Sequence, residues 1–482
     1  MKFSRGFSTL ELMIAFALMS LIFSGVILAH FGSTYWAIAA QTNNEGLYKA
    51  KTRLEELRAL VKKDFRLASS SMLAKVSDAY CDTGGLCYYV KTTITDLSPC
   101  SKYVDADVSW QVQGYPTTTT ALFTNLTDTN EAINLGGDCP LTTPPGAWAA
   151  ATLFSSADLS GVVPAGLDTL GGATYVVSNQ VPYFSIANTG SFVTFANSFA
   201  PMNALTSVDV ARDLTTGRTY AYATIASTSV GLEIIDVTDN NNPNSITKVS
   251  LAGVDKAGSF PQGWRVALYD RKAYVVTRET TGPEFHIIDV SNPANPTELG
   301  SRELNTSAYS LVVRDVKQGS TNRRLVFLAT TMDSKELMVL DATTPTTITE
   351  ITGAATDLPG DYDARSVFFS GNTLYIGRIN NAGRELYALD ASNIFGASGG
   401  LTTISSVESG GDVESIRVSE PYVFAGSSKS GGQLQIFTTT LGVLSSLTTF
   451  AVSGFSGGID LESNAVYVGS QNNPRVRIIK SQ

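Results

Sequence analysis

The sequence of 482 residues predicts two folded parts: an α+β unit with one long N-terminal helix and a small antiparallel sheet, then an all-β propeller. Two observations predict these parts. An apolar run without a charged residue extends from Leu12 to Ala29, and a motif of a strand followed by a turn recurs through the C-terminal part of the chain. The composition, 43% hydrophobic and 16% charged, is typical of a chain that folds.

The N-terminal helix is predicted over residues 7–68. Its apolar run is about 27 Å long at 1.5 Å per residue, which is enough to cross the core of a bilayer. From Leu47 to Val61, apolar residues recur at three- and four-residue spacing among charged ones, as in an amphipathic helix. Lys2 and Arg5 precede the apolar run, so the positive-inside rule places them in the cytoplasm and the rest of the chain outside it.

The residues before the apolar run do not match an ordinary export signal. A secretory signal has its cleavage site after the apolar segment, and a plain signal anchor has no reason to carry a carboxylate such as Glu11 at its start. A carboxylate is costly inside a bilayer, so Glu11 is expected to have a partner. The segment from Met1 to Gly6, followed by Phe7 and Glu11, resembles the type IV prepilin family.

The resemblance implies a leader of residues 1–6, cleaved after Gly6 by the prepilin peptidase, and methylation of the new amino-terminal Phe7. Glu11 is then the fifth residue of the mature chain, the position at which this family carries a glutamate that meets the terminal amine of a neighbouring subunit during filament assembly. The alternative is an uncleaved signal anchor in which Glu11 occurs by chance.

A small sheet is expected after the helix and completes a pilin-like domain over residues 7–140. Residues 104–110 alternate between apolar and polar side chains, and residues 119–126 offer a second strand. These two segments resemble strands of minor pilins and pseudopilins.

Four cysteines lie in this part of the chain: Cys81, Cys87, Cys100 and Cys139. Their even number and clustering predict two disulfides in an oxidising compartment. Of the three possible connectivities we favour Cys81 with Cys87 and Cys100 with Cys139, because a short loop separates the first pair. A zinc site is the alternative, but the spacings are not CxxC and the two histidines, His30 and His286, lie far away in the sequence.

The C-terminal part contains a repeated motif. Residues 231–237 and 284–290 are nearly identical copies that end in Ile-Ile-Asp-Val, and weaker copies place the aspartate position at 188, 341, 390, 438 and 480. Four short strands in a unit of roughly 40 to 50 residues are the signature of a propeller blade, which predicts a propeller of seven blades. The copies resemble LVIVD repeats of bacterial and archaeal surface proteins.

The propeller is predicted over residues 172–482, after a linker of residues 141–171. The last copy ends at Ile479, just after its third strand, so a strand from the N-terminal side of the propeller is expected to complete that blade and close the ring.

Charge and residue usage argue against several functions. The formal net charge is −9 and no basic block is present, so nucleic acid is not expected as a partner. With His30 and His286 the only histidines, neither a Ser-His-Asp triad nor a multi-histidine metal site can be built in this chain. No catalytic, cofactor-binding or metal-binding residue is predicted, and no cofactor. A pair of carboxylates in the central channel of the propeller, acting as in a glycosidase or a lyase, is an alternative that stays open.

Two groups of acidic residues in the propeller are predicted to have structural roles. The repeated Asp236, Asp289, Asp341 and Asp390 precede turns, where such side chains bond to turn amides. The segment 239–242 lacks the spaced ligands and terminal glutamate of a calcium loop, so calcium has no support there.

Together these features predict a minor or tip-displayed pilin-like filament subunit that is not an enzyme and that presents the propeller as an extracellular adhesion or binding platform. The expected partners are other pilin subunits through the N-terminal helix, the prepilin peptidase, the membrane before assembly, and an extracellular ligand of unknown identity. The chain is expected to cross the cytoplasmic membrane once and then reach the cell surface. Two alternatives stay open: a type II secretion pseudopilin, and a surface-anchored hydrolase or lyase.

Overall fold

The structure is a computed structural model of the full chain, and it divides into two compact units, residues 1–128 and 129–482. The described residues are 9–63, 78–81, 87–98, 101–111, 117–127, 147–159, 162–181, 183–188, 194–199, 204–213, 216–225, 227, 230–252, 263–318, 321–379, 383–395, 400–419, 421–462 and 465–481.

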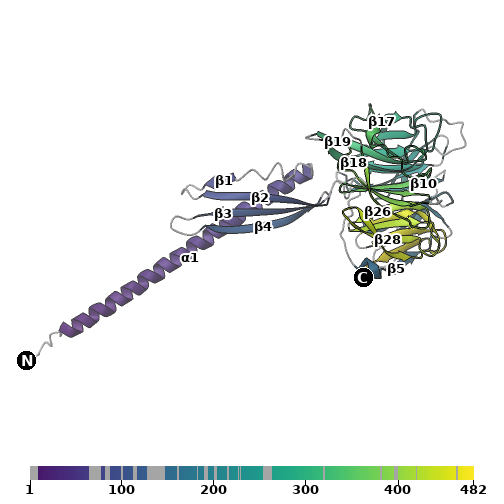
Figure 1. The fold of residues 1–482 in the computed structure, drawn as a ribbon. Coiled ribbons are helices and arrows are strands. Elements are labelled where there is room, and N and C mark those ends of the chain that lie inside the picture. The colour runs from purple at the N-terminus through teal and green to yellow at the C-terminus, as the bar shows by residue number, and fades with distance from the viewer. Residues whose placement is uncertain are drawn as a thin grey trace, which may run out of the picture. The chain divides into compact units, whose positions relative to one another are not determined.

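The first unit contains helix α1 (Thr9–Lys63) and one antiparallel sheet in the order β1-β2-β3-β4 (Figure 1). The strands are β1 (Asp78–Cys81), β2 (Cys87–Ser98), β3 (Ser101–Trp110) and β4 (Thr118–Thr127). The two strands predicted from the sequence are found as β3 and β4, whereas β1 and β2 were not predicted. The predicted helix ends, at residues 7 and 68, lie outside the described residues.

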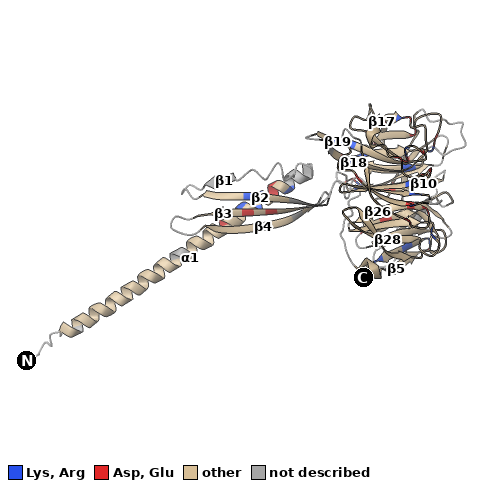
Figure 2. Ribbon diagram, viewed as in Figure 1, with Lys and Arg blue, Asp and Glu red and all other residues tan. Residues whose placement is uncertain are grey.

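The two halves of α1 have different surroundings. In the C-terminal half, Ala50, Leu54 and Leu57 are buried against apolar residues of β2, β3 and β4. In the N-terminal half the apolar side chains are exposed, for example Leu28 at 72%, and Figure 2 shows most of this half in tan, the colour of residues other than Lys, Arg, Asp and Glu. Within the described part of the chain, α1 is the one helix that is long and apolar enough to cross a membrane.

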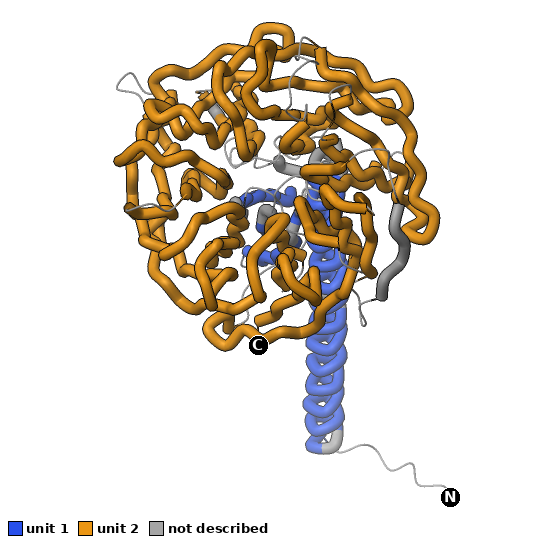
Figure 3. Tube along the Cα trace, turned by 90° about the vertical axis from the view of Figure 1, so that its right-hand side faces the viewer, with its two compact units in different colours: residues 1–128 blue, residues 129–482 orange. Residues whose placement is uncertain are grey.

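The second unit consists of four-stranded antiparallel sheets, and Figure 3 shows its trace closing into a ring. Seven such sheets are formed by the described residues of this unit. Six of them have four consecutive strands: β6 (Pro164–Leu170), β7 (Ala173–Ser178), β8 (Phe184–Asn188) and β9 (Thr194–Phe199); β10 (Leu205–Arg212), β11 (Thr219–Ile225), β12 (Leu232–Asp236) and β13 (Asn244–Val249); β14 (Arg265–Tyr269), β15 (Lys272–Val276), β16 (Phe285–Asp289) and β17 (Thr297–Arg302); β18 (Ala308–Gln318), β19 (Thr321–Thr330), β20 (Leu337–Asp341) and β21 (Thr349–Glu350); β22 (Ala364–Ser370), β23 (Thr373–Arg378), β24 (Leu386–Asp390) and β25 (Thr402–Val407); β26 (Val413–Ser419), β27 (Tyr422–Ser427), β28 (Leu434–Thr440) and β29 (Val443–Phe450).

The remaining sheet closes the ring. It combines β30 (Phe455–Glu462), β31 (Ala465–Ser470) and β32 (Val476–Lys480) from the end of the chain with β5 (Thr152–Ala157) from the start of the unit. In the register of this pairing, Leu153 lies opposite Ile479. The strand expected from the N-terminal side is therefore present.

This closure corrects the predicted domain boundary. Residues 141–171, predicted as a linker, include the short 3-10 helix η2 (Trp148–Ala150) and all of β5 and β6. The propeller thus begins before residue 172. The physical reason is that an unpaired edge on β32 would leave backbone N–H and C=O groups without partners, and β5 supplies them.

The first strands of the sheets, β6, β10, β14, β18, β22, β26 and β30, contact one another in a closed cycle. Apolar clusters between adjacent sheets hold this arrangement: one contains Tyr175 and Val210, and the next contains Tyr222 and Leu268. These packed interfaces fix the inner strands around a common centre, as in a β-propeller. A second short 3-10 helix, η3 (Thr352–Ala354), follows β21.

Candidate binding channel of the propeller

The inner strands line a central cavity of about 170 Å³. One position on each inner strand is equivalent, because it pairs with an aromatic residue on the second strand of the same sheet. In chain order these positions are Asp168, Asp209, Ala267, Val312, Phe368, Arg417 and Asp460, and all of them line the cavity. The four charged residues lie on neighbouring sheets, so at this level of the channel one side is polar and the other is apolar.

The three aspartates of this position hold adjacent sheets together. Asp168 accepts a hydrogen bond of 2.6 Å from the backbone N–H of Val210. In the same way Asp209 accepts one of 2.7 Å from Leu268, and Asp460 accepts one of 2.9 Å from Thr169. Each bond runs from one inner strand to the next, so these carboxylates are structural contacts between sheets as well as the polar wall of the channel.

The aspartates also affect one another. Burial, followed by the charges of Asp460 and Asp209, raises the pKa of Asp168 well above its usual range. The Nε of Arg417 donates a hydrogen bond of 3.1 Å to Asp460, which compensates one of the three charges. Asp168 therefore takes up a proton more readily than an ordinary carboxyl group.

Aromatic and cationic side chains gather where the inner strands β14, β18 and β22 begin. Trp264 contacts Tyr309 edge to face at 5.7 Å between ring centres. The guanidinium of Arg278 lies 4.0 Å from the centre of the Trp264 ring, and that of Arg365 lies 3.8 Å from the Tyr309 ring. Arg265, on the cavity wall, donates from Nε to the backbone carbonyl of Tyr309 at 3.3 Å. Three guanidinium groups therefore lie near this end of the inner strands, and of these Arg265 lines the cavity.

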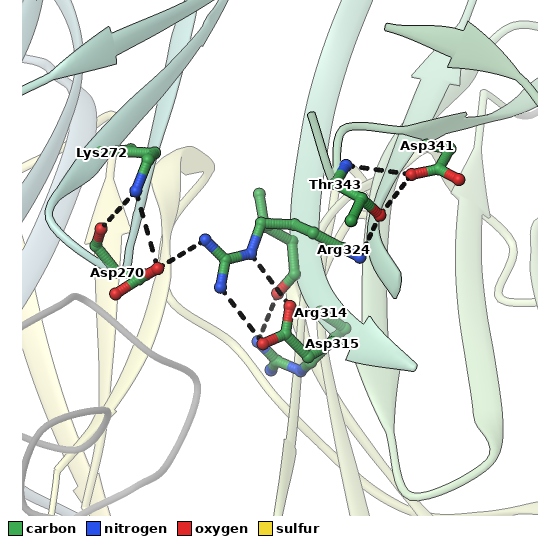
Figure 4. A network of polar contacts seen from close by, with 8 residues as sticks. Asp270, Lys272, Arg314, Asp315, Arg324, Asp341 and Thr343 are labelled. Carbon is green, nitrogen blue, oxygen red and sulfur yellow. Dashed lines mark hydrogen bonds and ion pairs between the residues drawn. The ribbon is translucent and has the colours of Figure 1, made fainter. Parts of the chain in front are cut away.

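Near the opposite ends of β14 and β18, Arg324 of β19 is neutralised by acids (Figure 4). Arg324 donates to Asp270 at 2.7 Å and to Asp315 at 2.9 Å, and Lys272 lies 3.6 Å from Asp270. The contacts with Asp315 and Asp270 join β19 to β18 and to the β14–β15 turn. We interpret this network as structural, because every charge in it has an opposite partner at short range.

The repeated aspartates have the structural role predicted from the sequence. Asp236, Asp289, Asp341 and Asp390 each accept a hydrogen bond from the backbone N–H two residues further on, at 2.9, 2.9, 2.9 and 2.8 Å. The bonds lower the pKa of Asp289, mainly through Ser291, and of Asp390, through Ser392. The repeated carboxylates thus shape the turns after the third strands.

Asp239 and His286 also form hydrogen bonds within the propeller unit. Asp239 accepts hydrogen bonds from the backbone N–H of Asn241 at 2.9 Å and from the Asn242 side chain at 2.7 Å. His286 is fully buried in β16 and bonds to Glu298 at 2.7 Å and to the carbonyl of Pro283 at 2.9 Å. The residues that the structure describes contain no group of three His, Cys, Asp or Glu side chains arranged to hold a metal ion.

The N-terminal residues predicted to be functional lie mostly beyond the described part. Gly6 and Phe7 lie outside the described residues, and Glu11 lies in the first turns of α1. Cys87 is disulfide-bonded, and the register of β1 and β2 places Cys81 directly opposite it. Cys100 and Cys139 lie outside the described residues.

The arginines at the channel end were not predicted as site residues. Their signal lies in the alignment of the copies: two residues before the position of Ala267, most inner strands carry serine or glycine, whereas β14 carries Arg265. A charged residue at one of seven equivalent positions is a departure from the repeat, and such departures indicate a specific contact.

A comparison with known protein families agrees with the repeat. The LVIVD repeat family matches residues 262–303, which contain the sheet β14–β17. The structure of a mitotic checkpoint complex shows a TM-score of 0.47 at 12% identity, over 71% of this chain and 99% of that one. A YCF48 protein from Cyanidioschyzon merolae shows a TM-score of 0.43 at 12% identity, over 69% of this chain and 99% of that one. No curated protein matches this chain in sequence. The chain thus contains a β-propeller with an LVIVD repeat.

Proposed function

We propose that this protein is a type IV pilin-like subunit, minor or tip-displayed, that presents a seven-bladed propeller outside the cell as a binding or adhesion platform. Each four-stranded sheet of the second unit is then one blade. The observation that carries the proposal is the N-terminal half of α1, which is apolar and has no covering partner among the described residues of the chain.

Such a surface requires another environment. Leu10, Phe16 and Phe23 are exposed by 66%, 66% and 60%, and Leu28 by 72%. An apolar surface of this length in water is unfavourable at about 25 cal/mol per Å². A bilayer covers it before assembly, and the helices of neighbouring subunits cover it in a filament.

The other half of α1 supports the same function. Ala50, Leu54 and Leu57 pack on the four-stranded sheet of the first unit. A continuous helix with one half in the domain and the other half available for assembly is the arrangement expected of a filament subunit. Glu11 lies in the available half, where a carboxylate needs a partner. The amine of Phe7 on a neighbouring subunit supplies it after cleavage behind Gly6.

We further propose that the propeller binds its ligand without transforming it. The carboxylates of the channel, Asp168, Asp209 and Asp460, already accept hydrogen bonds from backbone N–H groups of the next sheet. Carboxylates used in this way have less freedom to act as an acid and base pair on a glycosidic bond. The type II secretion pseudopilin is the second candidate, because the same helix would serve a short secretion filament.

The decisive experiment identifies the N-terminus of the protein in sheared filaments by mass spectrometry. N-methylated Phe7 in the sheared fraction is the expected result, because only a processed subunit enters a filament. A chain that retains Met1 and stays in the membrane would overturn the proposal. Retention of the processed chain in cells that shed other pilins would favour the pseudopilin.

A pair of variants tests the assembly carboxylate. Glu11→Gln is expected to be cleaved normally and to disappear from the sheared fraction, because the neutral amide does not attract the terminal amine. Glu55→Gln is the matched control, since Glu55 lies in the same helix and pairs with Arg58 at 2.6 Å on the surface. Equal recovery of both variants in filaments would contradict the role of Glu11.

A further inference from the structure

We propose that Arg265 on the channel wall, together with Trp264, Arg278, Tyr309 and Arg365 beside it, forms a binding site for a polyhydroxylated carboxylic acid, the chemistry of a single uronic acid residue. The inference rests on the proposed function of the propeller as a binding platform, and it names the ligand class of that platform.

Among the described residues Arg265 has no carboxylate within ion-pair distance, and the charge of Glu414 acts on it from further away. The Nε of Arg265 donates to the carbonyl of Tyr309, and no ion pair of Arg265 is found in the described part of the chain. Burial and the charge of Arg417 lower the pKa of Arg265 to about 10 against the opposing charge of Glu414, so the guanidinium is still charged at neutral pH. Arg324, at the other end of the same strands, has two acidic partners. An arginine left half-buried in a cavity with only a carbonyl partner is suited to an incoming anion.

The aromatic rings hold two further arginines in place. Arg278 lies over Trp264 at 4.0 Å and Arg365 over Tyr309 at 3.8 Å. A ring that contacts the face of a guanidinium leaves the N–H groups at its edge available, and these match the two oxygens of a carboxylate. The buried Nε of Arg278 has no hydrogen-bond partner among the described residues, while Arg365 already reaches Asp363 at 3.3 Å. Arg265 and Arg278 are therefore the two arginines with donors to spare.

The surrounding charges favour a monoanion over a dianion. Glu414 lines the cavity near Arg265 and Arg365. Burial and the charge of Asp412 raise the pKa of Glu414, while the two arginines lower it. A ligand with two negative charges, such as phosphate, would be repelled by Glu414 and by the aspartates deeper in the channel. A carboxylate adds a single charge and matches the geometry of Arg265.

The channel beyond Arg265 fits hydroxyl groups. The hydroxyl oxygens of Ser310 and Ser415 accept backbone N–H bonds at 3.4 and 3.2 Å, which leaves their protons to donate. The carboxylates of Asp168 and Asp209 supply acceptors further along the cavity wall. A cavity of about 170 Å³ is small beside the roughly 300 to 1,000 Å³ of pockets for larger ligands, so one ring is the largest unit that enters.

The test measures binding to the full-length processed protein in detergent by isothermal titration calorimetry. The probes are glucuronate, glucose and inorganic phosphate at constant ionic strength. Glucuronate is expected to bind at least about tenfold more tightly than either glucose or phosphate, because only glucuronate combines one negative charge with several hydroxyl groups. Equal binding of phosphate, or binding of glucose alone, would overturn the assignment.

Two variants locate the site. Arg265→Gln is expected to weaken glucuronate binding at least about tenfold, because a charge-assisted bidentate contact is lost. Arg218→Gln is the matched control, since Arg218 is exposed and pairs with Asp236 at 3.0 Å at the end of the third strand. Arg278→Gln repeats the test if Arg265→Gln lowers the melting temperature. If Arg265→Gln and Arg278→Gln both bind glucuronate as tightly as Arg218→Gln does, this end of the channel is not the binding site.

This experiment is separate from the test of the pilin proposal. Glucuronate binding is measured on purified protein and does not require filaments, whereas N-methylated Phe7 is sought in sheared filaments. Filaments containing this protein without glucuronate binding would overturn the ligand class alone. Glucuronate binding by a chain that retains Met1 would overturn the pilin assignment alone.

Discussion

The carboxylate of Asp168 accepts a hydrogen bond of 2.6 Å from the backbone N–H of Val210, across the boundary between two sheets of the propeller. The same carboxylate lies near the charges of Asp460 and Asp209, and burial and these charges raise its pKa. The carboxylate of Asp168 therefore joins two sheets, and its negative charge also destabilises the folded state. A neutral side chain of the same shape keeps the hydrogen bond and removes the charge repulsion.

Asp168→Asn is expected to raise the melting temperature at pH 7 and to have little effect near pH 4. An unfolded aspartate loses its proton near pH 3.9. Because folding raises the pKa of Asp168, the folded protein retains that proton at higher pH, and stability falls as the pH rises from about 4 through the raised pKa. Thermal unfolding followed by circular dichroism at several pH values measures the difference. Asp239→Asn is the control, since bonds with Asn242 and Asn241 lower the pKa of that exposed carboxyl group, and no gain at pH 7 is expected. A lower melting temperature for Asp168→Asn at pH 7 would contradict the reasoning.

Asp289→Ala is expected to lower the free energy of unfolding by about 1 kcal/mol, because the bond of 2.9 Å to the Ser291 N–H is lost. Asp289→Asn keeps an acceptor and should lose less. The bonds to Ser291 lower the pKa of Asp289, so the advantage of the wild type is present above pH 3.9 and declines as the pH falls through the lowered pKa. Urea unfolding at pH 7 and pH 3 measures both effects. An equal decrease in the free energy of unfolding for Asp289→Ala and Asp289→Asn would show that the hydrogen bond in the turn contributes nothing.

Gly46→Ala is expected to destabilise the first unit by about 1–3 kcal/mol, although alanine favours a helix. A Cβ at Gly46 would lie 2.5 Å from a ring atom of Trp110, and that ring is 1% exposed and packed 5.5 Å from Tyr88. Gly32→Ala is the matched control, because nothing lies within 4 Å of a Cβ there. Thermal unfolding in detergent measures the change in stability of both variants. A gain in stability for both would mean that Trp110 moves aside without cost.

Arg378→Met is expected to lower the free energy of unfolding by about 3–5 kcal/mol, because it leaves Glu336 as a buried charge without its partner. Both side chains are fully buried, and Nη1 of Arg378 lies 3.7 Å from Oε1 of Glu336. The double variant Arg378→Met with Glu336→Gln should recover part of the loss, since glutamine still accepts the Leu358 N–H bond of 2.9 Å. A double-mutant cycle by urea unfolding measures the coupling. Strictly additive losses would show that the two groups do not interact.

Several elements could be predicted because their signals are local. Period-two alternation marks β3 and β4, and the repeat marks the third strands of the sheets, including β12 and β16. β2 carries the same alternation, with Tyr88, Val90 and Ile94 buried, yet we did not predict it. The turn role of Asp289 was predicted because an aspartate before a turn finds its partner two residues away.

The apolar helix, the repeat and its turns could be predicted without a structure, because each depends on neighbours within a few residues. The pairing of β5 with the last sheet is known from the fold alone, since its partner β32 lies at the other end of the chain. The same holds for the channel: Trp264 and Arg365 come from different sheets and are joined through Tyr309. Closing the ring places distant segments side by side, and no local pattern encodes which side chains then meet.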